Sequence, residues 1–146
     1  TMTTKQERPS ALPSETHRIE TGYGKVYVTI SLDQNGRPHE VFVNMGQSGG
    51  LMNAWCESLG KVISAGLRSG VDPSVMVDQL AGIKMDKVQE DNGDRILSIP
   101  DAVGIGLKRT LLGRHAEPVR EIEMDQANTR DDSPYLFEIG EGGDKP

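Results

Sequence analysis

The chain has 146 residues, of which 35% are hydrophobic, 26% charged and 4% aromatic. This length allows one modest, mainly aliphatic core and excludes two domains of ordinary size. The sequence contains no long apolar run and no basic-then-apolar signal segment, so we expect a cytoplasmic protein that makes no membrane contact. The single cysteine, Cys56, excludes an internal disulfide and a cysteine-built metal site, and we expect no cofactor.

The net charge of −6 comes entirely from the C-terminal part of the chain. Residues 1–114 hold 13 acidic and 13 basic side chains, whereas residues 115–146 hold 9 acidic and 3 basic ones. Nucleic-acid binding without sequence preference requires a basic surface that releases counterions. A neutral body with an acidic tail therefore argues against a nucleic-acid partner.

Residues 1–16 are polar, carry two prolines and show no periodicity, which predicts a disordered leader or a loosely laid arm. The run KVYVTISL, the turn DQNG and the run RPHEVFVN then predict a β-hairpin of residues 24–32 and 37–44. Alternation places Val26, Val28 and Ile30 on one face of the first strand. In the second strand the two valines of VFV share a face, and Phe42 takes the other face.

Helical signals follow this hairpin. GQSGG ends the strand, and apolar spacing then predicts a helix of residues 49–68. Asp72 and Pro73 predict the start of a short helix that closes at Ala81-Gly82, and DNGD within the next polar stretch predicts a turn. SIPDAVGIGLKRTLLGR predicts a third helix with Gly113 after its end and the following residues available to the core: Ile105, Leu107, Leu111 and Leu112.

The order of two strands and three helices predicts an α+β fold, a small antiparallel hairpin or sheet packed on about three helices. Because a lone hairpin is marginal in water, it must lie on the helices or pair with the sheet edge of another copy, so a homo-oligomer is one expectation. The acidic residues 116–146 are either a flexible tail or a docking peptide. The docking candidates form one compact apolar run: Tyr135, Leu136, Phe137 and Ile139.

A series of short motifs then points to a family. TGYGKVYVTISLDQNGRPHEVFVNMGQSGG, ESLGKVISAGLRSGVDPSVMVDQLAGIK and LSIPDAVGIGL occur in this order, and the sequence resembles the TSCPD domain over residues 18–112. With the flanking residues this gives a TSCPD-like domain of residues 17–115. The resemblance implies a relation to the C-terminal domain of adenosylcobalamin-dependent (class II) ribonucleotide reductases, and the same domain also occurs as a free-standing small protein.

The resemblance also places four family cysteines at positions where this chain has Tyr23, Leu51, Met85 and Ile99. These side chains supply no thiolate, but a packed hydrophobic plug can fill the same volume. We therefore expect a small apolar core in place of a cysteine cluster, and folding without metal. For Cys56 we expect an inert, partly buried thiol.

No local motif joins a histidine to a nucleophile and a carboxylate, so we expect the chain alone not to be an enzyme. The candidates for ligand binding are glycines, hydroxyls, cations and one tyrosine at turns and helix ends: Tyr23, Lys25, Arg37, Ser48, Gly49, Gly50 and Arg68. The glycine-rich entrance to the first helix is either an anion site or a tight turn, and Tyr23 is either a core plug or a stacking platform. Each cation binds a phosphate or carboxylate, or is a solvated surface charge.

Three functions follow as hypotheses. The first is a non-catalytic accessory or regulatory module that binds a class II reductase large chain or a nucleotide. The second is a protein that sequesters or senses a nucleotide-type ligand, of the kind that a phage would encode. The third is an interaction protein that acts through its acidic tail.

Overall fold

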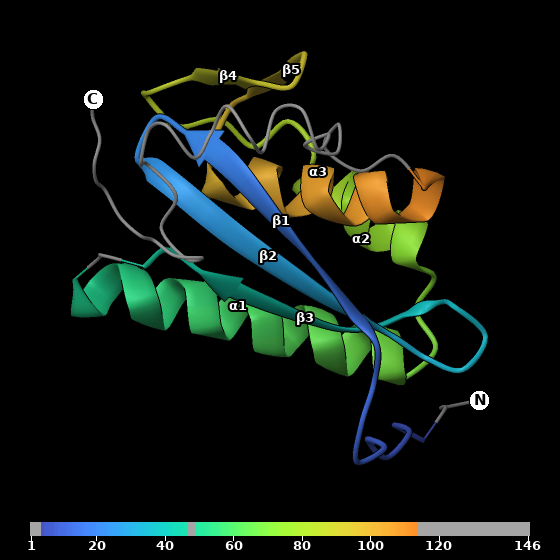
Figure 1. Ribbon diagram of the computed structural model, residues 1–146. Helices are drawn as coiled ribbons and strands as arrows, with labels where there is room; N and C mark the ends of the chain where they lie inside the picture. The colour runs from blue at the N-terminus through green and yellow to red at the C-terminus, as the bar shows by residue number, and fades with distance from the viewer. Residues whose placement is uncertain (1–3, 47–48, 114–146) are drawn as a thin grey trace, which may run out of the picture. The chain divides into compact units, whose positions relative to one another are not determined.

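The computed structural model describes residues 4–46 and 49–113. Over these residues the chain forms three helices and two small antiparallel sheets, which confirms the predicted α+β class (Figure 1). The elements in chain order are β1 (Ser14–Thr21), β2 (Gly24–Leu32), β3 (Pro38–Asn44), α1 (Gly50–Arg68), α2 (Pro73–Leu80), β4 (Gln89–Asp91), β5 (Asp94–Ile96) and α3 (Ile99–Leu112).

The main sheet has the strand order β1-β2-β3, and both pairs are antiparallel. The predicted hairpin is confirmed as β2 and β3, with an irregularity in register between Ser31 and Leu32. One face of the sheet is buried, and Ile30 of β2 lies opposite Val41 of β3 on it. Phe42 is half exposed on the other face, as its alternation with the neighbouring valines predicts.

Strand β1 was not predicted, and its first three residues belong to the stretch that we expected to be a leader or arm. The inward-facing residues of β1 are His17, Ile19 and Thr21, and all three are buried. Two of these three side chains are polar, so the alternation of buried and exposed residues produces no alternation in hydropathy. This explains why the sequence pattern does not reveal the strand.

Helix α3 covers the buried face of the sheet, and α2 packs against α3. A side chain at Gly106 would come within 3.3 Å of Val28, so the glycine lets the helix approach β2 closely. Of the α3 residues predicted for the core, Leu107 is fully buried and Ile105 partly buried. Leu111 and Leu112 are exposed because they lie in the last turn of the helix, so that part of the prediction is wrong.

Helix α1 runs along β3, which is an edge strand of the sheet. The helix and the strand touch so closely at Gly60 that a Cβ atom there would lie 2.9 Å from the carbonyl oxygen of Val41. The predicted hairpin therefore lies on the helices of its own chain, and α1 covers the edge of β3 that another copy would have to pair with.

The polar stretch after α2 contains the second, two-stranded sheet of β4 and β5. Its turn is formed by Asn92 and Gly93, both with positive φ, as the DNGD motif predicts. The hairpin is tied to the rest of the fold by Asp91, whose carboxylate accepts hydrogen bonds from the Glu20 backbone N–H of β1 and from Arg109 of α3.

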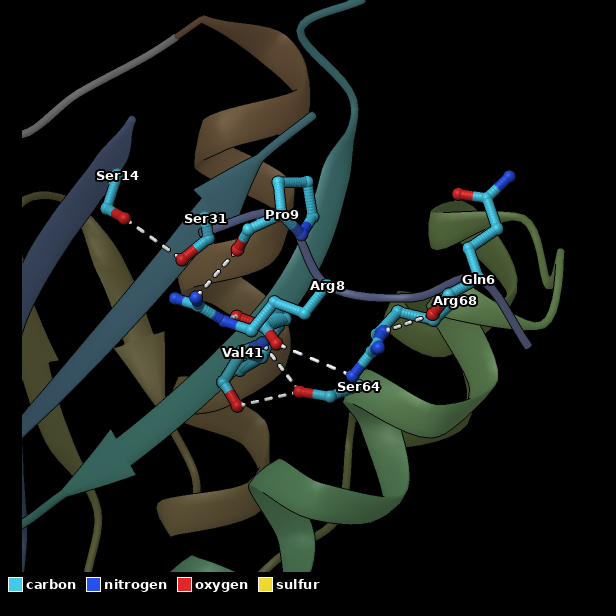
Figure 2. A network of polar contacts seen from close by, with 9 residues as sticks. Gln6, Arg8, Pro9, Ser14, Ser31, Val41, Ser64 and Arg68 are labelled. Carbon is cyan, nitrogen blue, oxygen red and sulfur yellow. Dashed lines mark hydrogen bonds and ion pairs between the residues drawn. The ribbon is translucent and has the colours of Figure 1, made fainter. Parts of the chain in front are cut away.

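The N-terminal arm lies over the end of α1 and the start of β3 (Figure 2). The backbone N–H of Gln6 donates to the carbonyl of Arg68, and the Arg68 Nε donates back to the carbonyl of Gln6. Arg8 forms an ion pair of 2.8 Å with the buried carboxylate of Glu40. The described part of the predicted leader is thus held by specific polar contacts.

None of the helices formed by residues 4–46 and 49–113 is both long and apolar enough to cross a membrane.

Candidate functional site

An open groove with a volume of about 530 Å³ lies between α1 and the chain that runs from the end of α2 to the start of α3. One side is formed by α1, and the other side, which we call the wall, is formed by Leu80, Ile83, Met85, Ile99 and Pro100. Its volume falls in the range of ordinary binding sites. Among the residues described along it, none carries a charge.

The α1 side of the groove exists because this helix has two apolar faces. The face toward the sheet is formed by Cys56, Gly60, Ile63 and Leu67, at helical spacing. A second set of residues projects away from the sheet, and we call it the ridge: Leu51, Trp55, Ser58 and Val62. Leu51, Trp55 and Val62 are 75%, 66% and 67% exposed. Large exposed apolar side chains gathered on one surface mark an interaction site.

Hydrogen bonds to one buried carboxylate hold the wall in place. Asp101, in the first turn of α3, accepts from the backbone N–H of Gly82 at 3.0 Å and of Leu97 at 2.9 Å. These two residues begin and end the excursion that contains β4 and β5. The backbone N–H of Met85 also donates to the carbonyl of Leu97. The shape of the wall therefore does not depend on an occupant of the groove.

Three of the four positions where the resemblance places family cysteines line this groove: Leu51, Met85 and Ile99. We expected these residues to form a packed core; Ile99 is indeed buried in the core, but the expectation is wrong for Leu51, which is largely exposed. Leu51 lies in the first turn of α1, where no other described element covers it. Leu51, Met85 and Ile99 therefore all line the groove, with Ile99 buried at its base and Leu51 exposed at its side.

Tyr23, at the fourth position, lies outside the lining of the groove, in the turn between β1 and β2. It is partly buried against the core, and the ammonium group of Lys87 lies 5.2 Å from the centre of its ring. This placement agrees with the interpretation of Tyr23 as a core plug. One face of the ring is already used by a cation, which leaves less of it for stacking.

The groove can hold an apolar surface, but the described part of its lining carries no carboxylate, imidazole or amine for acid–base chemistry. Burial raises the pKa of the Cys56 thiol, so this group is neutral at physiological pH. The hydroxyl of Ser58 donates to the carbonyl of Ala54 in its own helix. Elsewhere in the described part of the chain, no three His, Cys, Asp or Glu side chains lie close enough together to hold a metal ion.

The predicted anion site at the start of α1 is only partly described. Gly49 is the N-cap of α1 and Gly50 its first residue, and both are exposed. Ser48 lies outside the described residues. Gly49 itself has no side chain with which to cap this end of the helix.

The structure does not bring the predicted cations together at that helix entrance. Arg68 lies at the opposite end of α1, where Glu40 and the Gln6 carbonyl bind its guanidinium (Figure 2). Arg37 borders the same small hollow of about 100 Å³ as Arg68, but the hollow also contains Asp33. The C-terminal end of a helix carries a partial negative charge, so this hollow is a poor site for an anion. Lys25 is the second residue of β2, at the other end of the hairpin from Arg37.

The docking candidates Tyr135, Leu136, Phe137 and Ile139 lie outside the described residues.

A family model described as the TSCPD domain matches residues 2–111, about three quarters of the chain, and this confirms the resemblance. No curated protein and no solved structure matches the chain.

Proposed function

Because the chain belongs to the TSCPD domain family, which is associated with the C-terminal regions of ribonucleotide reductases, we propose that it is a non-catalytic accessory module that binds the large chain of a class II reductase. The observation that carries this proposal is the open apolar groove between α1 and the wall. Its described lining suits another protein surface better than a charged metabolite.

The composition of the groove supports a protein partner over a nucleotide. A nucleotide requires cationic or backbone N–H groups for its phosphates and hydrogen-bonding groups for its base. The groove combines an exposed tryptophan with leucine, valine and methionine side chains. Tryptophan at the centre of an apolar patch is typical of residues that dominate the energy of protein–protein interfaces.

The proposal is tested by titrating the purified class II reductase large chain of the same organism into the full-length protein. The two variants to compare are Val62→Asp in the ridge and Val75→Asp on α2. Both valines are exposed, at 67% and 45%, so neither change should unfold the protein, and Val75 lies outside the groove. We expect Val62→Asp to weaken binding by more than tenfold and Val75→Asp to leave the affinity within a factor of about three.

Absence of binding by the wild-type protein, or equal affinities for the two variants, would reject this function. Thermal shift measurements with a nucleotide panel test the competing hypothesis on the same samples. A rise in melting temperature that is lost in an Arg68→Ala variant would favour ligand sequestration or sensing instead.

A further inference from the structure

The groove and the ridge lie side by side on one surface, and this arrangement allows the surface to be complementary to itself. Trp55 and Val62 project from α1 beside the groove that the wall closes on the other side. A projecting ridge next to a groove of the same apolar character can dock on an identical surface turned by a two-fold axis. Each ridge then fills the groove of the other copy, and both copies make the same contacts.

We propose that, in the absence of the reductase, a second copy of this chain covers the groove, with the ridge of each α1 seated between the α1 and the wall of the other copy. This inference deepens the proposed function and rests on it, because the surface that self-association closes is the one that would bind the reductase chain. The reductase then has to compete with the second copy, so free accessory protein is kept in a masked form.

The apolar area agrees with what a stable dimer needs. Leu51, Trp55, Val62 and Ile83 are 75%, 66%, 67% and 42% exposed, and a tryptophan side chain alone buries about 150–250 Å² when it is fully covered. Each partner in a stable interface buries about 800 Å². The four side chains thus supply a substantial part of the required area. The floor of the groove, with Met52 and Leu59, and the charged rims contribute further area.

The charges beside the groove are complementary under the same two-fold operation. On the α1 side the exposed Glu57 and Lys61 form an ion pair of 3.0 Å across one helical turn. On the wall side the exposed Lys84 and Asp86 alternate along the chain with the lining residues Ile83 and Met85. Seating each ridge in the opposite groove brings the α1 rim of one copy against the wall rim of the other. Lys61 then faces Asp86 of the second copy, and Glu57 faces its Lys84.

These ion pairs set the orientation of the dimer more than its affinity. Glu57 and Lys61 are both more than two-thirds exposed, so their own pair is weak and can be exchanged for a partner across the interface. The apolar side chains of the ridge supply most of the binding free energy of the dimer. An occupant with a charged surface would leave uncompensated charge in the groove, whereas the second copy presents only apolar side chains and Ser58 there.

The first experiment measures the oligomeric state of the full-length protein alone by sedimentation equilibrium over a series of concentrations. We expect a dimer at micromolar concentrations for the wild type and for Val75→Asp, and a monomer for Val62→Asp. Trp55 is the only tryptophan of the chain, so its fluorescence reports on the ridge directly. Its emission should shift to longer wavelength on dilution of the wild type, as the ring becomes exposed. A monomeric wild type, or a dimeric Val62→Asp variant, would overturn the proposal.

The second experiment tests the arrangement with exchanged charges. Lys61→Glu and Asp86→Lys should each weaken the homodimer at least tenfold, since each places like charges opposite one another at both rims. An equimolar mixture of the two variants should recover the wild-type affinity as a heterodimer, because both contacts then pair opposite charges. Failure of the mixture to associate better than either variant would overturn the two-fold docking of ridge into groove.

Neither experiment contains the reductase, so the two proposals fail separately. A monomeric wild type that still binds the reductase through Val62 would overturn the self-association alone. A dimer that shows no affinity for the reductase would overturn the accessory function alone.

Discussion

The hydroxyl of Ser64 in α1 makes two hydrogen bonds to the backbone of Val41 in β3. It accepts from the Val41 N–H at 2.9 Å and donates to the Val41 carbonyl at 3.1 Å. Val41 lies on an edge strand, and its partner in the sheet is Ile30 of β2. One side chain of a helix thus supplies the donor and the acceptor that a further strand would have supplied, and the edge is closed to pairing.

Replacing Ser64 with alanine should lower the free energy of unfolding by about 2 kcal/mol, because a backbone donor and acceptor at a covered edge both lose their partner. The measurement is urea unfolding followed by circular dichroism. Ser58→Ala is the matched control, since that exposed hydroxyl donates to the Ala54 carbonyl of its own helix, and it should change stability by less than about 0.5 kcal/mol. Equal losses in the two variants would contradict this account of the β3 edge.

The close contact at Gly60 gives a second prediction. A Cβ there would lie 2.9 Å from the carbonyl oxygen of Val41, so Gly60→Ala should destabilise the protein by about 1–3 kcal/mol although alanine favours helix. At Gly50 of the same helix no atom of residues 4–46 and 49–113 lies within 4 Å of the added methyl group. Gly50→Ala should therefore be neutral or slightly stabilising in the same urea titration. A Gly60→Ala variant as stable as the wild type would show that α1 does not press against β3.

The sequence predicted the elements in which local and tertiary signals agree. The side chains of Asp72 and Ser98 cap the N-terminal ends of α2 and α3, and a proline follows each of them in the first turn. At the other end of α3, Gly113 ends the helix with a positive φ. The β2–β3 hairpin combines alternating apolar residues with a glycine turn. In these elements the pattern that sets the local conformation also sets which side chains are buried.

The groove could not be predicted because hydropathy alone indicates the wrong face of α1. The face that packs on β3 includes Gly60 and Cys56, small residues that the close contact requires, whereas the largest apolar side chains lie on the opposite face. Spacing shows that both sets are helical, but it does not show which set meets the sheet. In β4 and β5 the reason differs, since these short strands expose polar side chains and are held by Arg109, which is distant in sequence.

Arg109 gives the third prediction. Its guanidinium donates to the Asp91 carboxylate at 3.1 Å and to the Asp94 carboxylate at 2.9 Å, and it is buried. Arg109→Met leaves the nearly buried Asp91 carboxylate without its cation, so we expect a loss of about 3 kcal/mol in the free energy of unfolding. Lys108→Met, at the exposed neighbouring position, should cost less than about 0.5 kcal/mol.

The double variant Arg109→Met, Asp91→Asn separates the charge from the packing, because asparagine removes the uncompensated charge. It should recover part of the stability lost in the single variant. No recovery would show that Arg109 acts by packing alone.

Asp72 gives the fourth prediction, a dependence of stability on pH. The Ser74 backbone N–H, and then its hydroxyl, donate to the Asp72 carboxylate and hold the pKa of this group below its usual value. A lowered pKa in the folded state stabilises the fold above the pKa of the unfolded chain, near 3.9, and this contribution is lost as the pH falls through the folded value. Melting temperatures from neutral pH down to strongly acidic pH should therefore fall less steeply for Asp72→Asn, which keeps the cap but has no charge to lose.

Ser74→Ala is the control for this comparison. It removes the hydroxyl and keeps the backbone N–H, the larger of the two causes, so it should retain most of the pH dependence of the wild type. The two curves of Asp72→Asn and wild type should meet once the carboxyl is protonated in both the folded and the unfolded state. If they stay parallel over the whole acidic range, the start of α2 does not depend on the charge of its capping residue.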